Sequence, residues 1–339
     1  MPRLRSALAV TAAVLLLTGC AGSSSPTSSG SAAPGDGFPI TIAHALGETT
    51  IDAKPERVAT VGWSNQDVAL ALGVLPVGMD TQVWNWTGDA EPGVYDWTQD
   101  AIDALGGDEP VLFSTSDGTD FEAIADTDPD VILAAQSGLD EESYATLSEI
   151  APVVAYPDVA WFTSWRDTIT INAEALGLAD EGAQLVSDLE DQITNATADA
   201  DFAGTTAAFF AIGAADLSKI SIYTGGDART AFLGDLGFDL PQVAVDGAAS
   251  GSFYEDFSAE NADKLADVDV IVTYGDGDVL AALQADPLWS TLPAVKAGAV
   301  VEVGMGDAFS AGVSPTALSI PWVLDDYVSQ LKDAAAKVQ

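Results

Sequence analysis

Runs of apolar residues separated by short helical patterns predict a parallel α/β architecture in the first half of the chain. The largely apolar run at 57–62 predicts a buried strand. Residues 67–72 predict a short helix, which the following Gly73 terminates. A second apolar run at 75–79 predicts another strand immediately afterwards. The order strand, helix, strand is the βαβ element of a parallel sheet.

The same order of elements recurs in the second half of the chain. In the first half, a helix is predicted at 121–125 and a strand at 131–135. The corresponding segments of the second half are a helix at 261–265 and a strand at 270–274. A strand at 207–212 and a helix at 229–236 are predicted before them. This repetition predicts two similar α/β lobes.

A long amphipathic helix is predicted between the two lobes, over residues 180–200. It would form a stiff connection, although a crossover helix within one large sheet is the alternative. The expected organisation is a signal peptide at 1–19, a Ser/Gly/Pro tether at 20–37, an N-terminal lobe at 38–178, the interlobe helix at 179–201 and a C-terminal lobe at 202–339.

The first twenty residues have the pattern of an export signal. Arg3 and Arg5 precede an uncharged run at 7–17, which is too short to span a bilayer comfortably. The run leads to Cys20, and the sequence Leu-Thr-Gly-Cys resembles the bacterial lipobox, which implies that this cysteine is lipidated. The predicted location is the extracytoplasmic face of the cell membrane, with contact through the lipid anchor only. A chance cysteine in an ordinary signal peptide is the alternative.

Composition excludes several classes of function. The 52 acidic residues outnumber the 11 Lys and Arg, for a net charge of −41, so binding to nucleic acid is not expected. With one cysteine and one histidine the chain has no Cys/His set for zinc or an iron–sulfur cluster, and we expect no resident metal or cofactor. The histidine, His44, lies in a hairpin predicted around Gly47 and is interpreted as structural.

Several motifs together resemble the iron-siderophore and cobalamin substrate-binding proteins of ABC importers. They lie at 42–47 with 54–58, 63–65, 70–74 with 76–78, 122–125 with 128–133, 257–260, 286–289 and 292–298. The resemblance spans about residues 40 to 330. It implies a class III substrate-binding protein, in which a rigid helix joins two Rossmann-like lobes and the ligand lies in the cleft between them.

Ligands of open α/β sheets bind outside the carboxyl ends of strands, so candidate cleft residues are those that follow predicted strands. Most are aromatic, as suits the apolar flanks of a chelate, and the others are polar or cationic. The candidates are Trp63, Trp84, Trp86, Gln136, Trp161, Phe162, Arg166, Tyr223, Arg229, Tyr254, Tyr274 and Phe309. The alternative for Trp84 and Trp86 is that they cover the surface of a lobe. The alternative for Arg166 is an ion pair with Asp167 or another acid.

Two glutamates occupy matching places in the repeat. Glu122 and Glu260 begin equivalent predicted helices, where capping alone explains a carboxylate. In the resembled family the corresponding glutamates lie on top of the lobes and pair with arginines of the permease. The resemblance therefore implies that both residues dock on an ABC permease, which acts with its ATPase.

The scarcity of cations favours a neutral or weakly charged cargo. Outside the predicted signal only Arg57, Arg166 and Arg229 are arginines, so hydroxamate ferric siderophores are favoured over catecholates. Cobalamin is the alternative ligand, and a surface binding or sensor module with this fold is the alternative role. An enzyme is not expected, since no nucleophile elbow or P-loop is present, although carboxylates are abundant. We expect the protein to act as a monomer.

Overall fold

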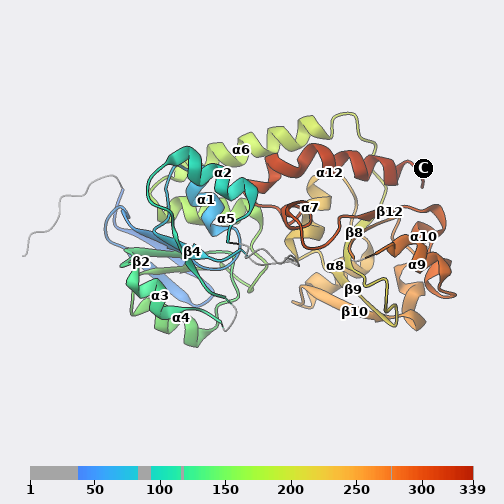
Figure 1. Cartoon of the computed structure of the whole chain (residues 1–339), viewed down its shortest axis with the longest axis horizontal. Helices are drawn as coiled ribbons and strands as arrows, with labels where there is room; N and C mark the ends of the chain where they lie inside the picture. Colours follow the sequence, from blue (N-terminus) through green and yellow to red (C-terminus); the bar gives the residue numbers. More distant parts are fainter. Residues whose placement is uncertain (1–36, 83–92, 116–117, 276, 339) are drawn as a thin grey trace, which may run out of the picture. The chain divides into compact units, whose positions relative to one another are not determined.

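The described chain is organised around two five-stranded sheets and a two-stranded hairpin (Figure 1). The structure is a computed structural model that describes residues 37–82, 93–115, 118–275 and 277–338. These residues belong to one compact unit, and the expected α/β architecture with two lobes is confirmed. Lobe boundaries drawn from the sequence stay predictions. Trp84, Trp86 and Cys20 lie outside the described residues.

The N-terminal lobe contains a fully parallel sheet. Its strands lie in the order β5 (Val111–Phe113), β4 (Gly78–Asp80), β3 (Val58–Thr60), β6 (Val131–Ala134) and β7 (Val153–Ala155). The helices of this lobe are α1 (Asn65–Ala71), α2 (Asp96–Leu105), α3 (Phe121–Asp126), α4 (Glu141–Ser148) and α5 (Trp165–Ala175). Parallel sheets need such crossover helices because successive strands run in the same direction.

The C-terminal lobe contains a mixed sheet. Its strands lie in the order β10 (Tyr254–Ser258), β9 (Lys219–Tyr223), β8 (Ala207–Ala211), β11 (Val270–Tyr274) and β12 (Val300–Glu302). β8, β11 and β12 are parallel, whereas β9 is antiparallel to both of its neighbours. The second lobe therefore shares the layered plan of the first but differs in strand direction, because β8 and β9 are joined without a crossover helix.

Helices and short 3₁₀ segments surround the second sheet. They are α7 (Ala228–Asp235), α8 (Gln242–Ala249), η1 (Ala259–Leu265), α9 (Val279–Ala285), η2 (Trp289–Thr291), α10 (Pro293–Ala297), α11 (Ala308–Gly312) and α12 (Ser319–Ala335). In the described part of the chain, no helix combines the length and apolar content that crossing a bilayer requires.

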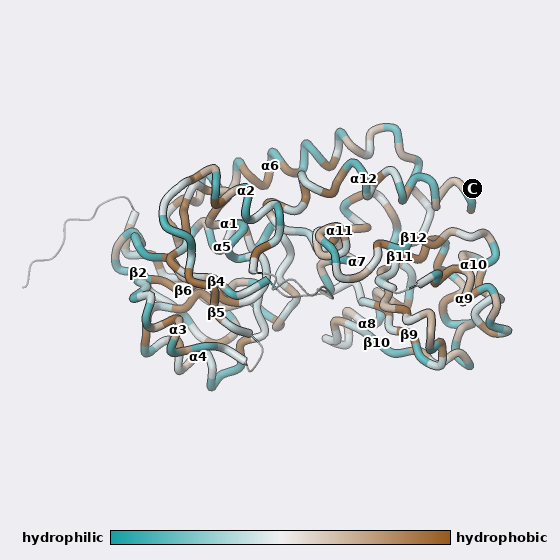
Figure 2. Tube along the Cα trace, in the orientation of Figure 1, coloured by the Kyte–Doolittle hydropathy of each residue, from teal (hydrophilic) through white to brown (hydrophobic). Residues whose placement is uncertain are grey.

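Alternation of side chains along the strands builds a core on each face of each sheet. In β6, Val131 and Leu133 pack into one cluster while Ile132 packs into another, and all three are completely buried. In β8, Phe209 and Phe210 likewise enter opposite clusters. Figure 2 shows the hydrophobic segments gathered along β4 and β6. Burial on both faces explains why these strands read as continuous apolar runs in the sequence.

The predicted hairpin is present as β1 (Ile40–His44) and β2 (Gly47–Ile51). His44 is buried in it, with Nε2 3.0 Å from the Thr49 hydroxyl and the ring edge-on to Tyr144. These contacts give the histidine a structural place, on the N-terminal lobe.

Two helices and a shared apolar cluster connect the lobes. α6 (Ala179–Ala196) leads from the first lobe to β8, and α12 packs against it (Figure 1). Val68 of α1 and Ile169 of α5 belong to the same buried cluster as Phe209 and Phe232 of the second lobe. A continuous core across the boundary restricts relative movement, since separation would expose apolar surface.

Polar contacts reinforce this connection on α5. Asp235 of α7 accepts a hydrogen bond of 2.9 Å from the Trp165 indole and ones of 2.8 and 2.9 Å from the Arg166 guanidinium. Arg166 also pairs with Glu190 of α6 at 2.7 Å. One arginine thereby links α5 to the connecting helix and to the second lobe.

The most buried of the interlobe contacts is formed by Asp67 of α1. Its carboxylate accepts hydrogen bonds from the Trp97 indole at 3.0 Å, from the Thr98 hydroxyl at 2.8 Å, and from the hydroxyl of Thr316, which precedes α12 in the second lobe. Asp67 is inaccessible to solvent, and burial raises the pKa of its carboxyl against the effect of these donors. The donors are what make a buried carboxylate tolerable.

Replacement of this carboxylate is expected to destabilise the protein strongly. In Asp67→Ala the donors of Trp97, Thr98 and Thr316 lose their acceptor inside the core, which should cost about 3 kcal/mol or more of the free energy of unfolding. Urea unfolding followed by circular dichroism measures the change. The matched control is Asp100→Ala, which replaces an exposed carboxylate of α2 and is expected to stay within about 0.5 kcal/mol. Equal effects of the two substitutions would contradict the role given to Asp67.

Candidate functional site

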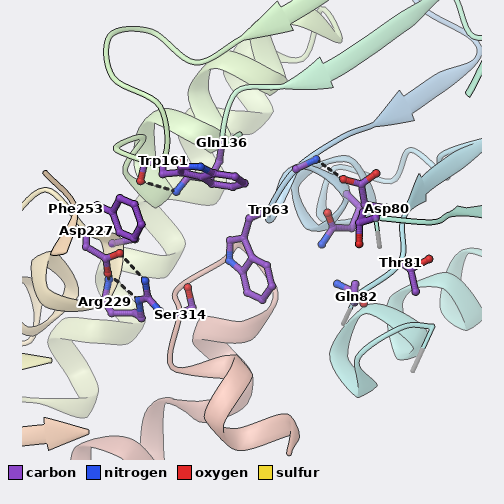
Figure 3. A pocket seen from close by; sticks show the side chains of 14 residues that line it. Trp63, Asp80, Thr81, Gln82, Gln136, Trp161, Asp227, Arg229, Phe253 and Ser314 are labelled. Atoms are coloured by element: carbon purple, nitrogen blue, oxygen red, sulfur yellow. Dashed lines mark hydrogen bonds and ion pairs between the residues drawn. The ribbon is translucent and has the colours of Figure 1, made fainter. Parts of the chain in front are cut away.

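A cavity of about 370 Å³ lies between residues of the two lobes (Figure 3). The first lobe contributes residues at the carboxyl ends of β3, β4 and β6, and the second contributes the start of α7 and two loops. The wall consists of Gly62, Trp63, Gln66, Asp80, Thr81, Gln82, Thr115, Gln136, Trp161, Asp227, Ala228, Arg229, Phe253 and Ser314. This is the position that open α/β sheets use for ligands.

Asn65 connects the ends of β3 and β6, which carry part of the N-terminal lobe's share of the cavity wall. Its side-chain amide donates to the carbonyls of Val61 and Gln136 at 2.9 and 3.0 Å, and its Oδ1 accepts from the Gln136 backbone N–H at 3.2 Å. Ser64 occupies the cap position of α1 without a side-chain capping bond, so Asn65 is free to connect the ends of β3 and β6.

Gly62 permits the close approach of these two strand ends. It has a φ of +88°, and a Cβ there would lie 2.5 Å from the Gln136 carbonyl oxygen. A side chain is therefore excluded on grounds of both conformation and space. In this conformation the backbone N–H of Gly62 points toward Asp80 and donates a hydrogen bond of 2.7 Å to its carboxylate.

Trp63 projects from the end of β3 into the cavity wall. Its backbone N–H donates to the Gln136 carbonyl at 2.9 Å, and its ring lies edge-on to Tyr95 with centroids 5.9 Å apart. Its indole Nε1 is buried and has no hydrogen-bond partner among the described residues. A buried unpaired donor at a cavity wall is a candidate for a ligand contact.

Trp161 holds an unusual backbone conformation at the cavity. Its φ of 67° lies in the left-handed region, which bulky residues rarely adopt, and 41% of the residue is exposed. The indole lies against Gly138, where a Cβ would come within 2.2 Å of Nε1. Such strain is typical of binding sites, where it presents a side chain that a relaxed loop would fold away.

Arg229 is the cation of the cavity wall and is matched by Asp227. The guanidinium donates through Nε to Oδ1 at 2.8 Å and through Nη2 to Oδ2 at 2.6 Å. It also lies 3.6 Å over the Tyr223 ring and 5.6 Å from that of Tyr274. Burial by itself would lower the pKa of Arg229, but the Asp227 charge outweighs it, and the pKa is raised well above the ordinary value. The arginine is therefore a fixed cation at the start of α7.

Asp80 supplies a carboxylate on the opposite side of the cavity, at the end of β4 (Figure 3). It is half-buried and pairs with no cation among the described residues. Burial raises its pKa to about 6, and the Gly62 hydrogen bond opposes this rise only partly. Among the residues that the structure describes, no group of three or more His, Cys, Asp or Glu side chains is arranged so that it could hold a metal ion.

Four of the residues predicted from the sequence come together in the wall: Trp63, Gln136, Trp161 and Arg229. Three more lie directly behind it. Phe162 lies against Gly226, where a Cβ would be 2.1 Å from its ring, and Tyr223 and Tyr274 face Arg229.

The structure does not bring three other candidates to the wall. Arg166 is engaged with Asp235 and Glu190 outside it, so the predicted ion pair with an acid is present, although not with Asp167. Tyr254 is 42% exposed on edge strand β10, and Phe309 packs toward Tyr327 in the core. Trp84 and Trp86 lie outside the described residues and stay predictions.

Several wall residues were missed by sequence reasoning. Asp80 and Thr81 directly follow the β4 run, so the rule of strand ends would have found them. Asp227 precedes the predicted α7 helix as its cap. Phe253 was missed in favour of its neighbour Tyr254. Gln66, Gln82, Thr115 and Ser314 carry no sequence signal that separates them from other polar residues.

The two glutamates predicted to dock are both exposed at the starts of short helices. Glu122 lies in the first turn of α3 and Glu260 in the first turn of η1, one in each lobe. Neither belongs to the cavity wall.

Comparison with known proteins places this geometry in a family. The model of the family described as periplasmic binding protein matches residues 58–305. The chain belongs to this family. The resemblance found in the sequence is thus confirmed.

Individual proteins also resemble the chain over most of its length. It is 42% identical to PiaA of Streptococcus pneumoniae TIGR4, solved in complex with ferrichrome, with a TM-score of 0.83 and coverage of 88% of this chain and 100% of that one. A periplasmic solute binding protein of Mycobacterium smegmatis is 30% identical, with a TM-score of 0.70 and coverage of 87% and 98%. The probable siderophore-binding lipoprotein YfiY of Bacillus subtilis is 27% identical over 305 residues, 86% of this chain and 87% of its own.

Asp80 should lower the stability of the unliganded protein at neutral pH. Its folded-state pKa of about 6 lies above the ordinary 3.8, so the stability it contributes is complete below pH 4 and is lost as pH rises through 6. Asp80→Asn should therefore raise the free energy of unfolding by about 1–2 kcal/mol at neutral pH, and the difference should close on acidification to about pH 4. Urea unfolding across this pH range measures it. A variant less stable than the wild type at neutral pH would contradict the assignment.

Proposed function

We propose that this protein captures a ferric siderophore of the hydroxamate type outside the cell and delivers it to an ABC permease. The observation that carries the proposal is the likeness to ferrichrome-bound PiaA, which extends over the whole of that chain at 42% identity. Ferrichrome is a ferric chelate with three hydroxamate groups. Membership of a binding-protein family supports capture rather than catalysis.

The chemistry of the cavity supports the same ligand class. Trp63, Trp161 and Phe253 offer aromatic surface to the apolar flanks of a chelate. Arg229 can donate to hydroxamate oxygens, but Asp227 already balances its charge. A chelate with several negative charges would meet no surplus of cations in this wall, which favours hydroxamates over catecholates.

Trp63, Gln136, Trp161 and Arg229 are proposed as direct ligand contacts. Tyr223 and Tyr274 are proposed to support the wall from behind, since their rings lie against Arg229, and Phe162 is proposed to do so through Gly226, which precedes the wall residue Asp227. Trp84 and Trp86 are proposed to approach the ligand from the segment that follows β4.

The proposed location is the extracytoplasmic face of the cell membrane, with the chain lipidated at Cys20. The lipobox-like sequence before Cys20 supports this, as does the relative YfiY, which is named a lipoprotein. The proposed partners are a permease and its ATPase, and the exposed Glu122 and Glu260 are the residues proposed to dock.

Tryptophan fluorescence should report the ligand. Titration with ferrichrome should quench the emission with a dissociation constant in the micromolar range or below, because Trp63 and Trp161 both line the cavity. A ferric tricatecholate should bind about tenfold more weakly or worse, since an uncompensated charge must be desolvated. Trp161→Phe should reduce the amplitude of quenching by ferrichrome. Quenching by cobalamin without any by ferric hydroxamates would replace the proposed ligand with a corrin.

Removal of the two docking carboxylates should uncouple binding from transport. Glu122→Ala combined with Glu260→Ala should abolish uptake of the ferric chelate in cells, while its affinity for the isolated protein stays unchanged. The matched control is Glu142→Ala with Glu181→Ala, which removes two exposed first-turn glutamates from α4 and α6. Normal uptake by the docking variant would exclude this role and favour a surface sensor or binding module.

A further inference from the structure

The cavity wall contains one carboxylate whose charge nothing in the described structure balances. Asp80 accepts a hydrogen bond at Oδ2 from the Gly62 backbone N–H, and no ion pair of the described residues includes it. Of the Lys and Arg residues in the sequence, just Arg3 and Arg5 lie beyond the described ranges, and both belong to the predicted signal peptide. Protein cations are therefore not positioned to neutralise Asp80.

The other charges of the wall cancel one another. Asp227 and Arg229 form a bidentate pair on the side opposite Asp80, and Trp63 lies between the two sides in Figure 3. The pair is about nine-tenths buried and has no net charge. When Asp80 is ionised, the fixed charge facing a ligand in the described wall is thus that of a single carboxylate.

Aromatic faces of the wall strengthen the preference for positively charged groups that the Asp80 carboxylate creates. Trp161 lines the cavity and is 41% exposed, and tryptophan faces attract cations through their electron-rich rings. In a partly desolvated cavity a lone charge acts over a longer range than it would in water. A positive group in the cargo would gain from both features, whereas an anionic group would be opposed by Asp80.

We infer that Asp80 is a charge-selecting residue of the ligand site, which favours ferric hydroxamate chelates that carry a protonated amine over otherwise identical neutral ones. The inference rests on the proposed capture of ferric hydroxamates. Three hydroxamates neutralise Fe³⁺, so the ammonium group leaves such a chelate with one positive charge. The ammonium would donate to Asp80 while the hydroxamate oxygens face Arg229.

The strongly acidic chain provides a competing explanation for any preference for cations. A net charge of −41 attracts cations to the whole surface, whatever occupies the cavity. Such long-range attraction is screened by physiological salt, whereas a direct contact in the cavity is screened much less. A control substitution that changes the net charge equally at a remote surface separates the two effects.

The test uses a matched ligand pair at neutral pH and physiological salt. One ligand is a linear ferric trihydroxamate with a terminal primary amine, and the other is its N-acetylated form, with the same iron coordination. Each is titrated against the full chain by tryptophan fluorescence, using the wild type, Asp80→Asn and the control Asp108→Asn, which removes an exposed carboxylate.

The wild type and Asp108→Asn should bind the amine form about tenfold more tightly than the acetylated form, as one charge-assisted contact provides. Asp80→Asn should lose this preference by weakening the amine form about tenfold, with the acetylated form changed less than about twofold.

A preference that survives in Asp80→Asn, or equal binding of both ligands to the wild type, overturns the role of Asp80 and leaves hydroxamate capture intact. Equal weakening of both ligands in Asp80→Asn also overturns it, because the residue would then shape the wall without reading charge. Failure of the wild type to bind either ligand overturns hydroxamate capture itself, and the inference with it.

Discussion

The buried carboxylate of Asp67 is the contact on which the arrangement of the site depends. Donors from α1, from α2 and from the loop before α12 converge on it, so that segments 249 residues apart in the chain share one acceptor. Buried charge is tolerated when its hydrogen bonds are satisfied, and it then demands one geometry. α1 begins at Asn65, which holds the ends of β3 and β6, so fixing α1 also fixes the wall that presents Trp63 and Gln136.

The parallel half of the fold followed from the sequence because its signals are local. Strands buried on both faces leave unbroken apolar runs, and the glycine after α1 marks the end of that helix. The reversal of β9 was not predicted, because strand direction depends on pairing with β8 and β10, which no local pattern records. η1 was expected to be an ordinary helix from Asn261, and it is a 3₁₀ segment from Ala259 with a kink at Asn261 itself.

The site was predictable to the extent that it follows strand ends. Trp63, Gln136 and Trp161 were found by that rule, but Phe253 was missed for Tyr254. The two rings are in contact, with centroids 4.9 Å apart, yet Phe253 lines the cavity whereas Tyr254 is exposed on β10, a difference that no local pattern records. Arg166 has its partner Asp235 on the other lobe, a pairing that only the folded chain can reveal. Asp80 lies at the end of β4, where the same rule applies, but it was passed over because the candidates were chosen for aromatic and cationic side chains and the chain has 52 acidic residues.

Burial with few compensating partners distinguishes Asp80 from Asp67 and Asp227, which are buried more deeply but are matched by donors or by a cation. An exposed carboxylate keeps its hydration and costs the fold nothing, but Asp80 is desolvated enough for its pKa to reach about 6, and one backbone donor compensates only part of that cost. Asp67 is buried more deeply, yet donors from two lobes surround it, so its place in the structure is explained by the contacts it makes. Asp80 has no comparable set of partners among the described residues, and it faces a cavity. When the free energy lost by desolvating a carboxylate is not offset by contacts within the protein, a contact with the bound ligand is the best explanation of its position.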